Sequence, residues 1–296
     1  MPQLVEARYT GGRGLKGATV RLEVTVYVDG AATTATGTPT YTVTRADGTA
    51  LVTAQNATAA AAGVYYYDLT PAQAVRVDKL TVVLAGTWVS AAQTFTFETE
   101  IVGEPLFTLS EARAFDASAL VTAATYPAAT ILEARDQITD QLEEWTWVSW
   151  IGRHARYDLA GSGTSRLTVS HHAIQNLIAA SIDNAAQTVS DVAVARFAPL
   201  LEHKTTIWAS PSTSDPLNVT VEYEHGRRGR PQGVSRIALL LLRDRLVKSD
   251  IPDSAIQYQG DKGAMQLVRE GGPMHNVTRI PEVNAWIAAN RLIPVS

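Results

Sequence analysis

The chain has 296 residues, with 25 basic and 29 acidic side chains, a net charge of −4 and no cysteine. At roughly 150 residues per domain this length suggests two domains. The absence of cysteine excludes disulfides, thiolate metal sites and cysteine nucleophiles. The acidic balance disfavours general nucleic-acid binding. No apolar run reaches 18 residues, and residues 1–10 have neither a basic nor an apolar leader segment, so we expect neither a membrane span nor a signal peptide.

Residues 1–103 contain 19 threonines, many valines and almost no helical periodicity. Residues 18–28 alternate apolar and polar side chains, which predicts a half-buried strand. Other short strands are expected at 3–9, 40–45, 51–54, 64–69, 80–85 and 93–101. About seven strands in about 100 residues are typical of an immunoglobulin-like β-sandwich.

After residue 103 the period changes to that of helices. Thr108 and Glu111 have the spacing of a capping box, which predicts a short helix to about Phe115. Tyr126-Pro127 precedes a longer predicted helix, about 128–150, whose apolar stripe is Ile131, Ile138, Leu142 and Trp145.

The remainder is expected to contain a β-rich insert and two more helices. Strands are predicted at 166–170 and 219–224, helices at 234–248 and 281–290, and an extended loop at 260–276, while 173–183 and 197–208 stay ambiguous between helix and strand. The chain is therefore predicted to be α+β: an all-β sandwich over 1–103, then a mainly α-helical domain over 104–296 with a β insert at about 153–226.

No pattern points to catalysis, a metal or a cofactor. His171 and His172 are adjacent, so on a strand they would face opposite ways, and we interpret them as polar residues at a strand-to-helix junction. Gly161-Ser-Gly163 lacks the context of a nucleophile elbow and is interpreted as a turn. We therefore expect a non-enzymatic protein without cofactors.

Tyr65, Tyr66 and Tyr67 are consecutive. They could form an exposed glycan-binding platform, although aromatic residues in strands more often belong to the core and to cross-strand pairs. The three tryptophans Trp145, Trp147 and Trp150 cannot share one narrow helical stripe. Either Trp147 and Trp150 contribute to a subunit interface, where aromatic residues are enriched, or they belong to a Trp-rich core.

Charge is distributed unevenly along the second region. Residues 104–144 hold eight acidic and two basic residues, a local net charge of −6, and residues 222–248 hold seven basic and three acidic residues, a net of +4. The acids Asp136, Asp140, Glu143 and Glu144 are either a solvated helix face or a lumen or interface lining. Arg227, Arg228 and Arg230 are either a soluble loop or contacts to carboxylates or phosphates of a partner.

Four stretches, in this order and spacing, resemble one family. They are Leu106-Phe-Thr-Leu-Ser-Glu-Ala-Arg-Ala-Phe115; Tyr126-Pro127 through Ile131-Leu-Glu-Ala-Arg135 to Leu142-Glu-Glu-Trp145; Val219-Thr-Val-Glu-Tyr-Glu-His-Gly226 with Pro231 and the following helix; and Asn276-Val-Thr-Arg-Ile-Pro-Glu-Val-Asn-Ala-Trp286. Residues 104–296 thereby resemble the head–tail adaptor (connector) proteins of long-tailed double-stranded DNA phages, in particular the actinobacteriophage versions.

The resemblance implies a structural virion protein in the neck, assembled in the host cytoplasm as a twelve-subunit ring below the portal. Portal protein would bind one side and a stopper or tail-terminator protein the other, with DNA passing through the lumen without sequence-specific contact and no membrane involved. By position, Arg291, Leu292 and Ile293 would reach toward the portal, and the N-terminal sandwich would decorate the neck. The alternatives are another neck or tail ring protein, or a glycan-binding module fused to a helical domain.

Overall fold

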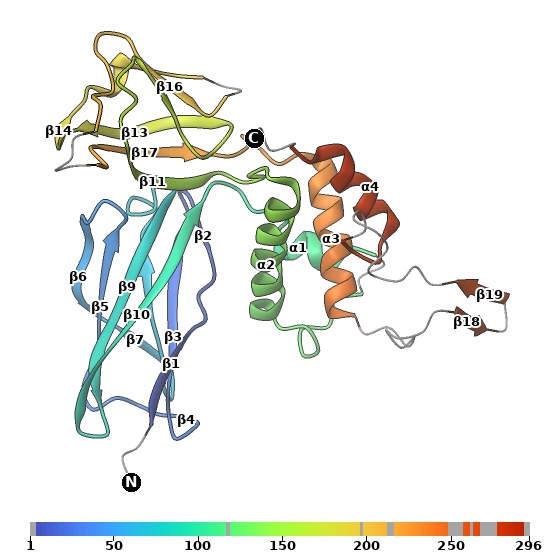
Figure 1. Ribbon diagram of the computed structural model, residues 1–296. Helices are drawn as coiled ribbons and strands as arrows, with labels where there is room; N and C mark the ends of the chain where they lie inside the picture. The colour runs from blue at the N-terminus through green and yellow to red at the C-terminus, as the bar shows by residue number, and fades with distance from the viewer. Residues whose placement is uncertain are drawn as a thin grey trace. The chain divides into compact units, whose positions relative to one another are not determined.

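We describe the protein from a computed structural model (Figure 1). The residues described are 4–116, 119–195, 198–211, 216–247, 257–260, 263–266 and 277–292. The chain divides into two compact units, each built from two separate stretches: Met1–Pro105 with Ile151–Gly229, and Leu106–Trp150 with Arg230–Ser296. Residues 151–229 thus group with the N-terminal region.

The protein is mostly β, with 39% of its residues in strands and 21% in helices. The prediction of a mainly α-helical second domain is therefore wrong. Both stretches that the sequence pattern left ambiguous contain strands, and four α-helices occur among the described residues. The described α-helices lie in the second unit, whereas the insert is built from sheets and one short 3₁₀ helix.

The N-terminal region forms two sheets. The first has the order β1 (Val5–Tyr9), β3 (Val20–Val28), β8 (Val64–Leu69) and β7 (Thr58–Ala61), with β4 (Ala31–Ala32) on β3. The second has the order β2 (Gly14–Leu15), β10 (Ala91–Val102), β9 (Asp78–Trp88), β5 (Thr40–Arg45) and β6 (Ala50–Asn56). All pairs are antiparallel except β2 with β10, and the order of the longer strands is that of the two sheets of an immunoglobulin-type sandwich.

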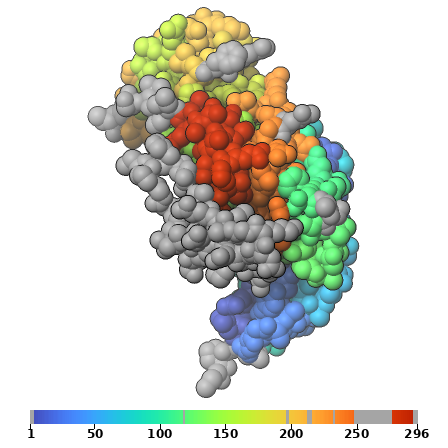
Figure 2. Space-filling model, turned by 90° about the vertical axis from the view of Figure 1, so that its right-hand side faces the viewer, coloured from blue at the N-terminus to red at the C-terminus, as the bar shows by residue number. Residues whose placement is uncertain are grey.

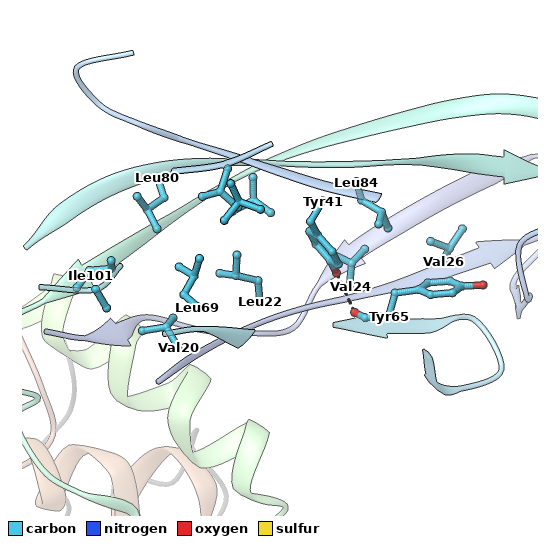
Figure 3. Packing of buried hydrophobic residues seen from close by; sticks show 14 of the residues in the cluster. Val20, Leu22, Val24, Val26, Tyr41, Tyr65, Leu69, Leu80, Leu84 and Ile101 are labelled. Carbon is cyan, nitrogen blue, oxygen red and sulfur yellow. Dashed lines mark hydrogen bonds between the residues drawn. The ribbon is translucent and has the colours of Figure 1, made fainter. Parts of the chain in front are cut away.

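The side chains between these sheets form one apolar core (Figure 3). Along β3, alternation places Val20, Leu22, Val24 and Val26 inside, each at most 4% exposed. The hydroxyl of Tyr41 donates a 2.8 Å hydrogen bond to a backbone carbonyl of β8, so a polar atom buried in this core is satisfied.

The insert is a second β module within the same unit. Its larger sheet has the order β11 (Arg153–Leu159), β17 (Val219–His225), β13 (Ile174–Ile182) and β14 (Ala185–Ala186). Its smaller sheet has the order β12 (Arg166–Thr168), β16 (Leu200–His203) and β15 (Val192–Val194), preceded by the short helix η1 (Val189–Asp191). The module has its own core, in which Leu201, Trp208, Val219, Val221 and Tyr223 are fully buried.

The second unit contains the helices α1 (Leu109–Ala114), α2 (Ala128–Thr146), α3 (Gln232–Leu246) and α4 (Pro281–Asn290). The capping box at the start of α1 is confirmed: the Thr108 hydroxyl accepts from the Glu111 backbone N–H, and the Glu111 carboxylate accepts from the Thr108 N–H at 2.6 Å. Figure 2 shows α4 (red) against α3 (orange), and both helices also contact α2.

Two predictions in this unit need correction. The helix expected to run to residue 150 ends at Thr146, for a reason given below. The stretch 260–276 was predicted to be a loop, but its residues Gly263–Gln266 form β19, which pairs with β18 (Gln257–Gly260) in a hairpin. The other residues of that stretch beyond Gly260 lie outside the described part of the chain.

Candidate functional site

The C-terminal end of α2 is fixed by backbone geometry. Trp147 adopts a left-handed conformation (φ 60°, ψ 23°) and donates its N–H to the Glu143 carbonyl at 2.8 Å, which ends the helix. The Glu143 carboxylate then accepts from the Trp150 backbone N–H at 3.0 Å. Positive φ is uncommon for a non-glycine residue, and these hydrogen bonds stabilise it at Trp147.

Buried polar contacts support the same helix end. Thr146 is fully buried; its hydroxyl donates to the Leu142 carbonyl and accepts from the Trp150 indole N–H at 2.8 Å. The Trp150 ring is 2% exposed and lies 4.9 Å from the Trp286 ring. Trp150 therefore packs inside the unit, which leaves the partner contact suggested for this pair to Trp147.

The residues after α4 meet this helix end. The Leu292 N–H donates to the Thr146 carbonyl at 2.9 Å, so Leu292 and Trp147 both adjoin Thr146. Trp147 is 56% exposed and Leu292 is 37% exposed. We call these two side chains the Trp147 surface. Of the proposed portal-facing residues, Arg291 is also exposed, whereas Ile293 lies outside the described residues.

The basic residues of the predicted partner contact have separate roles. Arg230 forms a two-pronged ion pair with Glu111, both N–O distances being 2.7 Å, and this hydrogen-bonded pairing lowers the pKa of Glu111 to about 2. Arg228 is exposed and donates to the Gln175 carbonyl at 3.2 Å, and Arg227 is exposed. Arg230 is thus occupied within the chain rather than presented to a partner.

Opposite charges of the two charged stretches also meet within one chain. Besides Arg230 with Glu111, Arg243 on α3 contacts Asp116 at 2.8 Å. Both pairs join the acidic stretch 104–144 to the basic stretch 222–248. Part of the charge complementarity read from the sequence therefore stabilises the second unit itself.

The four candidate lumen acids lie along one side of α2. Asp136, Asp140, Glu143 and Glu144 are spaced by four, three and one residues, which places them on one helical face. Asp136 contacts the neighbouring Arg135 at 2.9 Å, and Glu143 caps the helix end as described. Asp140 and Glu144 are exposed.

A buried charge cluster in the first unit escaped the sequence analysis. Glu222 on β17 has a side chain 2% exposed, and its carboxylate contacts Arg76 at 3.2 Å, Arg156 at 3.1 Å and His154 at 3.0 Å. Burial raises the pKa of this carboxyl, but the hydrogen bond with His154 and the charge of Arg76 outweigh the burial and lower it. Arg76 also pairs with Asp47 and Asp78, and Asp78 pairs with Arg45. We call this connected group the Glu222 cluster; it consists of Glu222, Arg76, Arg156, His154, Asp78, Asp47 and Arg45.

The histidines that the structure describes do not gather into a metal centre. No group of three metal-binding side chains occurs within the described ranges. His171 and His172 lie between two strands, not at the strand-to-helix junction that was predicted. The His171 ring stacks on His225 at 3.7 Å and its Nδ1 lies 3.0 Å from the Tyr223 hydroxyl; burial lowers the pKa of His171, and lowers that of His225 to about 3.

The tyrosines and the glycine-flanked serine have structural roles. Tyr65 is 2% exposed and packs edge-on against Trp88, while Tyr66 lies beneath the Arg21 guanidinium at 4.0 Å. The three consecutive tyrosines therefore do not form one open platform. Ser162 donates to the Arg166 carbonyl, and no base adjoins it among its described contacts.

Comparisons with known proteins add no assignment. No family model matches the sequence, and the search of curated proteins gave no match. Among solved structures, the chain is similar to a conjugative transposon lipoprotein from Bacteroides eggerthii, with 14% identity and a TM-score of 0.20 over 34% of this chain and 96% of that one. A TM-score this low carries no argument. Among the described helices, none has the length and apolarity to cross a membrane.

Proposed function

We propose that the protein is a structural virion component, a head-to-tail adaptor that forms a ring below the portal and lets DNA pass through its lumen. In this proposal one side of the ring binds portal protein and the other binds a stopper or tail-terminator protein. The protein does no covalent chemistry; its role is to hold neighbouring proteins in a fixed geometry.

The organisation of the second unit supports the proposal. Three of the four stretches that resemble adaptor proteins contribute α1, α2 and α4, and the fourth ends in α3. These helices come from two stretches separated by the whole insert, yet they form one compact unit. The resemblance implies a helical core interrupted by a β insert.

The observation that carries the proposal is the exposure of Trp147. The chain has six tryptophans, and the other five are buried or half-buried. The backbone N–H of Trp147 is bonded to Glu143, and its neighbour Thr146 is bonded to Leu292. An exposed tryptophan on an ordered helix end is typical of an anchor in a protein interface.

A ring requires a heterologous interface, in which the Trp147 surface of one copy meets a different surface of the next. Such an interface buries about 800 Å² on each partner, and a few aromatic anchors supply most of its binding energy. We therefore expect Trp147 to be an anchor of ring closure or of portal docking.

The test compares three proteins by native mass spectrometry and by sedimentation, alone and mixed with the portal ring. We expect the wild type to form a closed oligomer, alone or on the portal, and Trp147→Ala to weaken assembly at least about 30-fold, as loss of a hot-spot side chain costs about 2 kcal/mol or more. Val121→Ala is the control, because Val121 is 55% exposed in the same unit. A monomeric wild type that also fails to bind the portal would refute the proposal.

A further inference from the structure

The first unit contains two β modules whose apolar cores are separate. The sandwich core and the insert core share no residue. Several charged side chains cross from one module to the other. The joint between the modules therefore contains ion pairs, whereas the two cores are apolar.

Arg76 lies at the centre of this joint. It precedes β9 of the sandwich, and its guanidinium contacts Asp47 at 3.0 Å, Asp78 at 3.1 Å and Glu222 at 3.2 Å. Asp47 and Asp78 belong to the sandwich, whereas Glu222 is on the central strand of the insert. One side chain thus ties carboxylates of both modules together.

On the insert side of the joint, Glu222 likewise contacts several charged or polar partners. Arg156 and His154, both on β11, contact the Glu222 carboxylate together with Arg76. With Arg45 paired to Asp78, the Glu222 cluster holds three carboxylates against three guanidinium groups and one imidazole. Such a buried arrangement is stable only when every charge keeps its partner.

Two further ion pairs cross the joint. Lys16 of the sandwich contacts Glu224 of β17 at 3.2 Å, and Arg153 of β11 lies 3.6 Å from Glu100 of β10. The Gly103 N–H also donates to the Gly152 carbonyl at 2.9 Å. Apart from this backbone contact, the crossing contacts named here are all ionic.

We infer that the Glu222 cluster is the element that fixes the insert to the sandwich, so that neutralising Glu222 releases the insert as a folded module. Removing this charge leaves Arg76 and Arg156 facing each other without their shared counter-ion, which disfavours the joined state. Because neither core contains these residues, both modules keep their folds.

The test measures a distance between the modules. Since the chain has no cysteine, a pair of exposed positions, Ala59 on β7 and Ala186 on β14, can be changed to cysteine and spin-labelled for pulsed dipolar spectroscopy. The otherwise wild-type protein should give one narrow distance distribution. Glu222→Gln should lose that single narrow distance and give a broad distribution.

Three comparisons make the result decisive. Glu202→Gln is the matched control, because Glu202 forms an exposed pair with Arg166 in the insert, and it should keep the narrow distance. Arg76→Gln should broaden the distribution as Glu222→Gln does. The near-ultraviolet signals of the buried Trp88 and Trp208, one in each module, should persist in both variants.

A narrow distance retained in either Glu222→Gln or Arg76→Gln would overturn the inference, because the joint would then be held without the cluster. Loss of the Trp208 signal in both variants would also overturn it, since Glu222 would then be part of the fold of the insert and not of its attachment.

Discussion

Two sets of ion pairs, one in each compact unit, differ in burial. In the first unit the side chains of Asp78 and Glu222 are 0% and 2% exposed, and each contacts two or more cationic groups. In the second unit Arg236 with Glu282 and Arg243 with Asp116 are all between 41% and 63% exposed. The distances are similar, so burial and not geometry decides how much each pair contributes to stability.

The difference in burial follows from where in the fold the charged residues lie. The pairs Arg236–Glu282 and Arg243–Asp116 of the second unit are exposed, so water screens them. Asp78 and Glu222 of the first unit lie where the two β modules meet. A charge in that position must be matched, because it has lost its hydration.

The largest effect is expected for Asp78→Ala. Asp78 is fully buried and accepts from Arg45, Arg76 and the Ala46 N–H, so its removal takes a carboxylate partner from two partly buried guanidinium groups. The free energy of unfolding should fall by about 3–5 kcal/mol. Urea denaturation measures it, and Glu282→Ala, at an exposed pair, should show no measurable change; equal effects of the two substitutions would contradict the comparison.

An intermediate effect is expected for Thr146→Val, which tests a buried neutral contact of the second unit. The Trp150 indole N–H would lose its acceptor, which should lower the free energy of unfolding by about 1–3 kcal/mol. Thr139→Val is the matched control: Thr139 is also buried, but its hydroxyl only donates to a helix carbonyl. A thermal unfolding series in which both variants lose the same stability would show that the Trp150 contact contributes nothing.

The smallest effect is the pH dependence of the pair between Glu111 and Arg230. The pKa of Glu111 is lowered from 4.5 to about 2 in the folded protein, so its stabilising contribution is complete above pH 4.5 and is lost as the pH falls toward 2. Because Glu111 is 41% exposed, we expect only about 1 kcal/mol. Arg230→Gln should remove this part of the acid dependence; an unchanged difference in stability between pH 5 and pH 2.5 would contradict the assignment.

Regular patterns were predictable from the sequence. Strand β3 and helix α4 were predicted with bounds within two residues of those observed, because alternation in one and Pro281 at the start of the other are local signals. The end of α2 was not predictable in this way. It depends on Trp147 adopting positive φ, which residue type alone argues against.

Strand β13 shows why residues 173–183 could not be classified. Its register shifts twice, between Ile174 and Asn176 and between Leu177 and Ala179. These irregularities bury Ile174, Leu177 and Ala180, at a spacing of three residues, which resembles a helical pattern more than the alternation of a strand. The helix-or-strand ambiguity therefore has a structural cause.

The Glu222 cluster was missed for a different reason. Along β17, Glu222 and Glu224 occupy the polar phase of a regular alternation, which predicts a solvent-facing side. That side is 1% and 9% exposed because charged residues from the sandwich cover it. Contacts between residues more than 140 positions apart leave no local signal in one sequence.

The proposal of a neck adaptor is tested most directly by cryo-electron microscopy of intact phage particles that contain the protein. We predict a ring of twelve copies between portal and tail, in which the Trp147 surface is covered by a neighbouring subunit or by the portal and DNA fills the lumen. A position elsewhere in the particle, or a ring in which Trp147 faces solvent, would contradict the account.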